Sequence, residues 1–178
     1  MSKGIGRPGN MHEMVERLAI QELLHAHSRG LDRSDSALLK SCYWENAEVD
    51  YGSFKGSAHQ FAELVPAALS SQYELTQHCI SNTLIAMGGE QARSESLVTA
   101  YHLLQGGQEE MVYSGRYLDR FERRDGAWRI VHRRVVMDWS RRHAVSDERN
   151  SEGFAALAKG RNDGEDPSFV FFAMEDQR

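Results

Sequence analysis

The stretch from residue 74 to residue 139 constrains the fold of this chain more than any other feature. Three pairs of turn residues interrupt it: Gly88-Gly89, Gly106-Gly107 and Asp125-Gly126. Glycine adopts positive φ without steric cost, and Asp-Gly between two strand-like runs is a strong hairpin signal. The pattern therefore predicts consecutive antiparallel strands, over residues 74–87, 92–105, 109–123 and 127–139.

The segment before these strands has helical periodicity. From about His12 to Leu31 the apolar residues recur every three or four positions, and Gly30 lies where this helix is expected to end. A second, shorter helix is expected to continue through Tyr43, capped by Ser34 or Asp35.

Two further elements are expected before the long strands. Residues 47–54 favour a short strand, followed by a turn at Lys55-Gly56. A helix is expected from Ser57 to about Ser71, kinked or divided at Pro66.

Helices followed by a strand meander predict an α+β fold, with the helices covering one face of a curved, mostly antiparallel sheet. Residues 1–10 are expected to form a flexible arm and residues 11–140 the folded domain. Residues 141–178 form a polar extension with a possible short helix at 151–159. Its apolar run, Phe169 to Phe172, is expected to cover either a pocket mouth or a neighbouring subunit.

Composition excludes several classes of protein. The net charge of −5 over 178 residues argues against a nucleic-acid partner. Six arginines alternate with acids over two strands and indicate a solvated face; they are Arg120, Arg123, Arg124, Arg129, Arg133 and Arg134. The chain has no apolar run of membrane-spanning length and no signal-peptide pattern, so we expect a cytoplasmic protein without a membrane contact.

The sequence offers no cofactor or metal motif. Gly4, Gly6 and Gly9 formally match a dinucleotide-binding pattern, but no strand precedes them. Cys42 and Cys79 have neither disulfide nor metal spacing, and reduced thiols are the simpler reading. We expect no cofactor and no metal.

Two ionisable residues are expected to point inward and to meet. Asp32 closes the first helix and His78 lies in a half-buried strand. A carboxylate bonded to one imidazole nitrogen fixes the tautomer and raises the basicity of the other nitrogen. The alternatives are a turn aspartate bonded to backbone amides and a satisfied core histidine.

Three other candidates each have a structural alternative. His102 lies on one strand face with Val98 and Ala100, and that face is either a pocket wall or a packed core. His27 shares a pocket with Asp32 only if the helix unwinds near Gly30, since five residues turn about 140° on a regular helix. Arg133 either stabilises negative charge or pairs with a carboxylate across the sheet.

The order of several short motifs resembles the SnoaL-like branch of the nuclear-transport-factor-2-like superfamily. These motifs cover residues 12–139 and are Ala19 to Leu23 before Leu31-Asp32-Arg33, His78 before Asn82, Gly115-Arg116-Tyr117, and Arg123 to Ile130 before Arg133. The resemblance implies a cystatin-like cone in which the N-terminal helices pack in the concave face of the sheet.

The resemblance also carries expectations about activity. It implies an Asp32–His78 catalytic dyad, with Arg133, His27 and a second strand histidine, His102, as further site residues. It implies a cofactor-free, dehydratase-like lyase or an isomerase that acts on a small hydrophobic, aromatic or polycyclic compound. It also implies a homo-oligomer, with a trimer favoured over a dimer. The alternatives are a non-catalytic small subunit of an aromatic-ring dioxygenase and a protein that binds a hydrophobic ligand.

Overall fold

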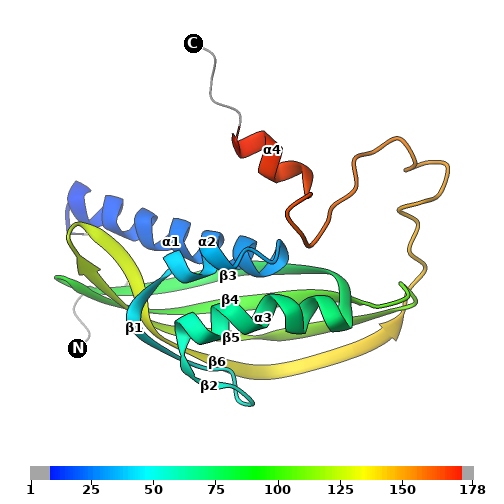
Figure 1. Ribbon diagram of the computed structural model, residues 1–178. Helices are drawn as coiled ribbons and strands as arrows, with labels where there is room; N and C mark the ends of the chain where they lie inside the picture. Colours follow the sequence, from blue (N-terminus) through cyan, green and yellow to red (C-terminus); the bar gives the residue numbers. More distant parts are fainter. Residues whose placement is uncertain (1–8, 174–178) are drawn as a thin grey trace, which may run out of the picture.

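The computed structural model describes residues 9–173 and consists of helices laid against one sheet (Figure 1). Most of the expected arm, residues 1–10, and the last five residues lie outside the described part. In chain order the elements are α1 (Met11–Asp32), α2 (Ser36–Ser41), β1 (Tyr43–Asp50), β2 (Lys55–Ser57), α3 (Ala58–Gln72), β3 (Tyr73–Gly88), β4 (Gln91–Leu104), β5 (Glu109–Arg124), β6 (Ala127–Ala144) and α4 (Pro167–Ala173).

The six strands form one sheet in the order β2-β1-β6-β5-β4-β3. Every neighbouring pair is antiparallel except β1 and β6, which are parallel. Helices α1, α2 and α3 lie together over one face of the curved sheet (Figure 1). The expected α+β class, with N-terminal helices on a mostly antiparallel curved sheet, is confirmed.

The expected hairpin turns are present. Asp125 and Gly126 have φ angles of 51° and 82°, the left-handed conformation that a two-residue hairpin requires at both positions. Gly89 and Gly106 also have positive φ, at 69° and 92°. Together these turns bring β3, β4, β5 and β6 into sequential antiparallel pairs.

Helix α1 begins after Asn10, whose side chain accepts a 2.9 Å hydrogen bond from the amide of Glu13. The helix continues two residues past Gly30 and ends at Asp32, so the prediction that Asp32 closes it is confirmed. Gly30 is instead a contact with α2: a Cβ at this position would lie 2.7 Å from Leu39 Cγ. The longer helix delivers Asp32 to the edge strand β3.

The core lies between the helices and the sheet. Its fully buried members include Ile20 and Leu24 of α1, Leu39 of α2, and Phe121 and Ile130 of the sheet. At α1 these positions recur at helical spacing, so one face of the helix is buried as the periodicity indicates.

Several predicted boundaries between residues 34 and 72 are wrong. The second helix ends at Ser41, and β1 runs over residues 43–50 instead of 47–54, since Tyr43 is fully buried as part of the sheet. Lys55-Gly56 belongs to β2, and the turn lies before it, where Gly52 has a φ of 80°.

Helix α3 contains Pro66 without being divided. Proline removes one backbone donor, but apolar residues on both sides of it hold the helix against the core. Phe61 and Ala62 are buried before it, and Val65 and Leu69 pack against the core around and after it.

The C-terminal region also differs from expectation. Strand β6 continues to Ala144, beyond the expected end of this strand at residue 139. The possible helix at 151–159 is absent and turns replace it, because Phe154 and Leu157 remain exposed and no apolar face is buried. The helix forms later, as α4, where Asp166 and Pro167 provide an N-cap and a favoured first residue.

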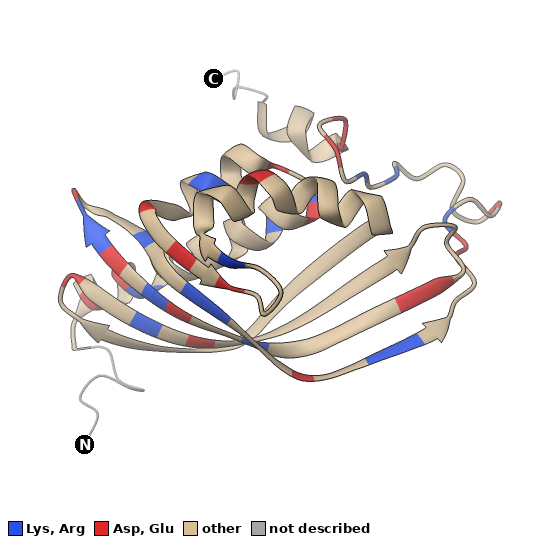
Figure 2. Ribbon diagram, turned by 60° about the horizontal axis from the view of Figure 1, so that its bottom comes forward, with Lys and Arg blue, Asp and Glu red and all other residues tan. Residues whose placement is uncertain are grey.

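Charged side chains gather toward one end of the sheet, whereas the central part of the strands is largely uncharged (Figure 2). No helix in residues 9–173 is long and apolar enough to cross a membrane.

Candidate functional site

Asp32, the last residue of α1, is hydrogen-bonded to His78 of β3. Asp32 Oδ1 lies 2.7 Å from His78 Nδ1, and Asp32 Oδ2 accepts the backbone N–H of His78 at 2.9 Å. The hydroxyl of Thr76 donates to Oδ1 at 2.8 Å. The side chains of Asp32 and His78 are only 11% and 8% exposed. The carboxylate is therefore held by three donors from one strand.

This arrangement assigns the tautomer of His78. A carboxylate accepts hydrogen bonds, so the neutral ring carries its proton on Nδ1 and its lone pair on Nε2. His78 lines a cavity on the helix-covered face of the sheet. The histidine therefore presents a proton acceptor to whatever occupies that cavity.

The cavity is small and mostly apolar, with a volume of about 240 Å³. Helices α1 and α3 supply Leu31, Phe61 and Val65 to its wall. Aromatic rings with hydroxyl groups, Tyr113 and Tyr117, come from the sheet. Such a lining suits a compact ring compound with one or two polar groups.

His102 of β4 also lines this cavity, so of the two alternatives its strand face is the pocket wall. Its ring centroid lies 5.5 Å from that of His78, edge to face. His102 Nδ1 is 3.3 Å from the carbonyl oxygen of Met111 and must donate to it. Burial, with a contribution from His78, lowers the pKa of His102 to about 4. The ring is neutral near pH 7, with a bare Nε2.

His27 is not part of this cavity. This residue of α1 is fully buried, with Nε2 2.7 Å from the hydroxyl of Tyr43 and Nδ1 2.8 Å from Arg133 Nη1. Burial and the nearby Arg133 charge hold the pKa of His27 well below its usual value. Because α1 does not unwind at Gly30, His27 and Asp32 point in different directions.

Arg133 is also fully buried, so it does not belong to the solvated arginine face expected from sequence. It forms a two-point ion pair with Asp119, with Nε–Oδ1 and Nη2–Oδ2 distances of 2.8 Å each. Its guanidinium also lies 4.0 Å from the ring centroid of Tyr117. Of the two alternatives for Arg133, the structure contains the ion pair, and its charge lies directly behind a cavity wall residue.

Two residues near the dyad were missed by sequence reasoning. Thr76 could have been found, because residues two apart on a strand share a face and Thr76 precedes His78 by two. Tyr51 could not, since it lies in a turn and no periodicity marks it. Tyr51 lines the cavity, and its buried hydroxyl lies near Arg133 and Tyr43 without an aligned hydrogen bond. Burial raises the pKa of Tyr51, and Arg133 opposes that effect.

Residues 9–173 contain no group of three or more histidine, cysteine, aspartate or glutamate side chains placed to hold a metal ion. Cys42 is buried, which raises the pKa of its thiol to about 11 and keeps it protonated. The chemistry that the cavity can supply through its own side chains is proton transfer by imidazole and phenol groups.

A family model and several known proteins are similar in sequence to this chain. The family model described as "SnoaL-like domain" matches residues 12–134. Hexachlorocyclohexane dehydrochlorinase 1 of Sphingobium indicum is 25% identical over 125 residues, which span 68% of this chain and 80% of that protein. An uncharacterized Mycobacterium tuberculosis protein is 23% identical over 124 residues, which span 68% of this chain and 84% of that protein.

Solved structures share the fold. A hexachlorocyclohexane dehydrochlorinase of type 2 superposes with a TM-score of 0.66 at 23% identity, covering 75% of this chain and 90% of the other. A Novosphingobium aromaticivorans protein provisionally named a scytalone dehydratase gives 0.65 at 23% identity, covering 75% and 91%.

Proposed function

Because the chain belongs to the SnoaL-like domain family, we propose that it is a cofactor-independent lyase or isomerase acting on a small hydrophobic ring compound. The observation that carries this proposal is the 2.7 Å contact between Asp32 and His78. It leaves His78 Nε2 as a free base at an apolar cavity. A purely structural role would not require an oriented base at that position.

The proposed reaction begins with proton removal from carbon. His78 Nε2 takes a proton from a carbon next to a carbonyl group, and Asp32 stabilises the imidazolium that forms. In an elimination, the electron pair of the C–H bond becomes the new C=C bond while the bond to a neighbouring hydroxyl or halide breaks. In an isomerisation, the proton returns to a different carbon.

A departing hydroxyl group must gain a proton to leave as water. Tyr51 is our candidate donor, since its hydroxyl is neutral, buried and close to Arg133, whose charge would stabilise the phenolate left behind. His102 is better suited to accept a hydrogen bond from a substrate hydroxyl, because its Nδ1 proton is committed to Met111. Proton transfer by positioned groups contributes about 10²–10⁴ in rate.

The named relatives belong to the same reaction class. One is a dehydrochlorinase and another is provisionally a scytalone dehydratase, and both names denote eliminations. The shared class supports an elimination by this chain, and the aromatic wall of the cavity supports a ring substrate.

Two other functions remain as alternatives to test: a non-catalytic dioxygenase subunit and a hydrophobic ligand carrier. The Asp32–His78 pair favours the enzyme over both. Purification of the chain without an iron–sulfur partner protein would argue against the subunit role.

The proton-removal step can be tested without knowing the natural substrate. In D₂O with EDTA, the protein should accelerate exchange of the α-protons of 2-tetralone, a compact ring ketone, and should dehydrate cyclic β-hydroxy ketones of similar size. His78→Gln should abolish both reactions. His25→Gln is the matched control, because His25 is an exposed histidine of α1 that faces away from the cavity.

Catalysis that survives His78→Gln within a few-fold would overturn the proposed base. Activity lost with EDTA and regained with a divalent ion would overturn the cofactor-free mechanism.

A further inference from the structure

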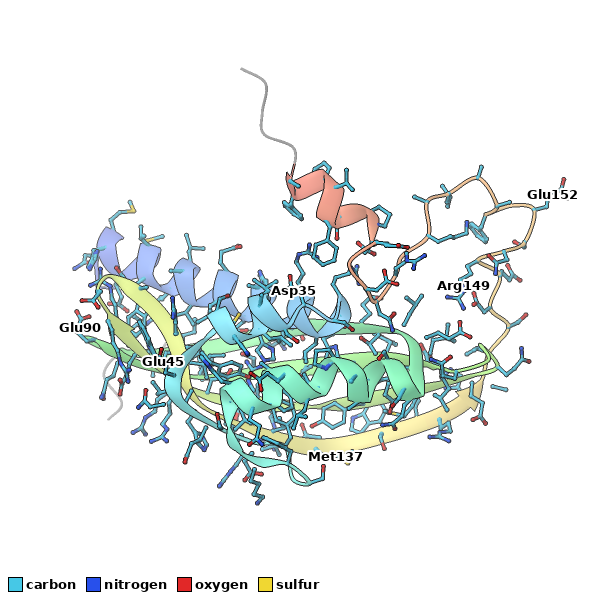
Figure 3. All side chains as sticks on the ribbon, in the orientation of Figure 1. Asp35, Glu45, Glu90, Met137, Arg149 and Glu152 are labelled. Carbon is cyan, nitrogen blue, oxygen red and sulfur yellow. The ribbon has the colours of Figure 1, made fainter. Side chains whose placement is uncertain are left out.

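Asp166 is an unusual residue of the C-terminal extension. Most of the extension is exposed, and Glu152 at its outer turn projects away from the rest of the molecule (Figure 3). Asp166, by contrast, is 3% exposed. Its carboxylate accepts hydrogen bonds from the amides of Arg161 (2.9 Å) and Ser168 (3.0 Å) and from the Ser168 hydroxyl (2.5 Å). Although burial opposes it, these donors lower the pKa of Asp166 to about 2.

The charge of Asp166 is directed at Arg33, the residue that follows Asp32. Arg33 Nε lies 3.3 Å from Asp166 Oδ1. Another nitrogen of the same guanidinium, Nη1, donates to the backbone carbonyl of Asp32 at 3.1 Å. The extension is thus attached to the end of α1, immediately beside the dyad carboxylate.

A second cavity, of about 510 Å³, lies between the extension and this end of α1. Asp32, Arg33 and Thr76 line one side of it, and Asp147 and Gly160 of the extension line the other. Asp32 therefore borders two spaces, the apolar cavity through His78 and this second cavity directly. Within the described chain, the Arg33 guanidinium makes no ion pair with Asp32 at 4.0 Å or less.

We propose that Asp166 is a positioning residue, which holds the Arg33 guanidinium away from the Asp32 carboxylate so that Asp32 remains committed to His78. This inference rests on the proposed function only for its effect on catalysis. The geometric claim, that Arg33 would otherwise pair with Asp32, stands independently.

The alternative partners of Arg33 explain why Asp166 is needed. Asp147 and Glu110 line the same second cavity, but Asp147 is paired with Arg149 at 2.6 Å and Glu110 with His143 at 3.2 Å. Among the described residues, Asp32 Oδ2 accepts one hydrogen bond, from the His78 amide, and Asp32 lines the cavity. Once Asp166 is neutralised, Asp32 is the cavity-lining carboxylate next to Arg33 in the chain, and its Oδ2 is bonded by a backbone amide.

An arginine on Asp32 would compete with His78 for the negative charge. Guanidinium groups bind carboxylates at two points, which would turn the carboxylate away from the imidazole. The other titratable or charged groups that face His78 are His102, Tyr51, Tyr113 and Tyr117 around the apolar cavity, and His27 behind it.

The test uses Asp166→Asn in the full-length chain. Asparagine keeps one acceptor oxygen for the α4 cap at Ser168, while the charge and the bond from the Arg161 amide are removed. The first readout is the downfield NMR resonance of the His78 Nδ1 proton, identified by its loss in His78→Gln. The second is kcat against KM in the exchange reaction.

In Asp166→Asn we expect the resonance to move upfield and kcat to fall about tenfold, a part of the roughly 10²–10⁴ that positioned acid–base groups supply, with KM unchanged. Arg33→Gln alone should leave both readouts near wild type. Adding Arg33→Gln to Asp166→Asn should restore them. Asp163→Asn is the matched control, since Asp163 is an exposed aspartate of the same extension that pairs with Arg161.

Two results would overturn the proposal. One is an unchanged resonance in Asp166→Asn. The other is a double variant as impaired as Asp166→Asn, which would mean that Asp166 acts through the extension and not through Arg33. A resonance that shifts as expected in a protein without exchange activity would refute the enzyme and leave the positioning role intact.

Discussion

Arg133 and Asp119 face each other across β6 and β5 in a two-point ion pair, and both side chains are fully shielded from solvent. The ion pair links β5 to β6 on the face of the sheet that the helices cover. Arg133 Nη1 also lies 2.8 Å from Nδ1 of His27 in α1. A buried ion pair contributes little net stability as a pair, but either partner alone is an uncompensated buried charge. Loss of activity in an Arg133 variant would therefore indicate loss of the folded structure before it indicated a catalytic role for Arg133.

Arg133→Met should destabilise the protein by about 3–5 kcal/mol, because it leaves Asp119 buried and unpaired. Arg134→Met is the control at the adjacent position, where the side chain is 60% exposed and its ion pair with Asp50 is screened by water. Urea unfolding monitored by tryptophan fluorescence measures both. Equal midpoints for the two variants would show that the Arg133 charge is not buried as described.

Two substitutions around Asp32 should separate charge from hydrogen bonding. Asp32→Asn removes the carboxylate charge that orients His78 and should reduce kcat by about 10²–10⁴. Thr76→Val removes one 2.8 Å hydrogen bond to the same oxygen and should reduce kcat only a few-fold. Circular dichroism should show both variants folded. Equal losses in the two variants would contradict a role for the charge.

Stability should fall as the pH is lowered from 7 toward 4. The pKa of His102 is lowered by burial to about 4, whereas in the unfolded chain it returns to its ordinary value of 6.5. Between these values the unfolded state binds more protons, so acid favours unfolding by about 2 kcal/mol at pH 5 from this residue. His27 acts in the same direction.

His102→Asn should flatten this pH dependence. Urea midpoints at pH 7 and pH 5, for wild type and variant, measure the difference. If the variant loses as much stability on acidification as the wild type, His102 is not the neutral group that we describe.

Gly30→Ala should destabilise the protein by about 1–3 kcal/mol, although alanine is normally the better helix residue. The added methyl group would lie 2.7 Å from Leu39 Cγ, which forces α1 and α2 apart. Leu39→Ala in the same chain makes room, so the double variant should lose less than the sum of the two single variants. Thermal unfolding distinguishes these outcomes, and strict additivity would refute the contact.

The protein should assemble as a homo-oligomer, and we expect a trimer. This expectation is based on large apolar side chains that are exposed in the monomer. Trp139 is 51% exposed, and Phe171 and Phe172 of α4 are each 71% exposed. Native mass spectrometry gives the state directly. A monodisperse monomer at micromolar concentration would rule out the assembly.

Deletion of residues 165–178 would then assign the role of α4. Loss of assembly supports a subunit contact, whereas an intact oligomer with altered ligand access supports a lid. In the structure α4 contacts α1, where the Arg29 guanidinium lies over the rings of Phe169 and Phe172. A lid role would require α4 to leave this position.

Much of the architecture was predictable because its determinants are local. Gly88-Gly89, Gly106-Gly107 and Asp125-Gly126 divide the second half of the chain into strands, since turn conformations depend on a few adjacent residues. Asp35 was similarly recognisable as a helix cap and accepts the amide of Leu38 at 2.9 Å. The expectation that Asp32 and His78 meet came from their inward-facing positions and from motif order, and the structure places Oδ1 and Nδ1 2.7 Å apart.

The composition of the site was decided by contacts between distant segments. Whether His27 could join Asp32 depended on whether α1 unwinds near Gly30; the helix continues through Asp32, and His27 contacts Arg133 instead. Tyr51 reaches the cavity from a turn, and Asp166 reaches Arg33 from more than 130 positions away. Local sequence sets backbone conformation, but burial and charge pairing depend on which surfaces meet, and only the tertiary structure decides that.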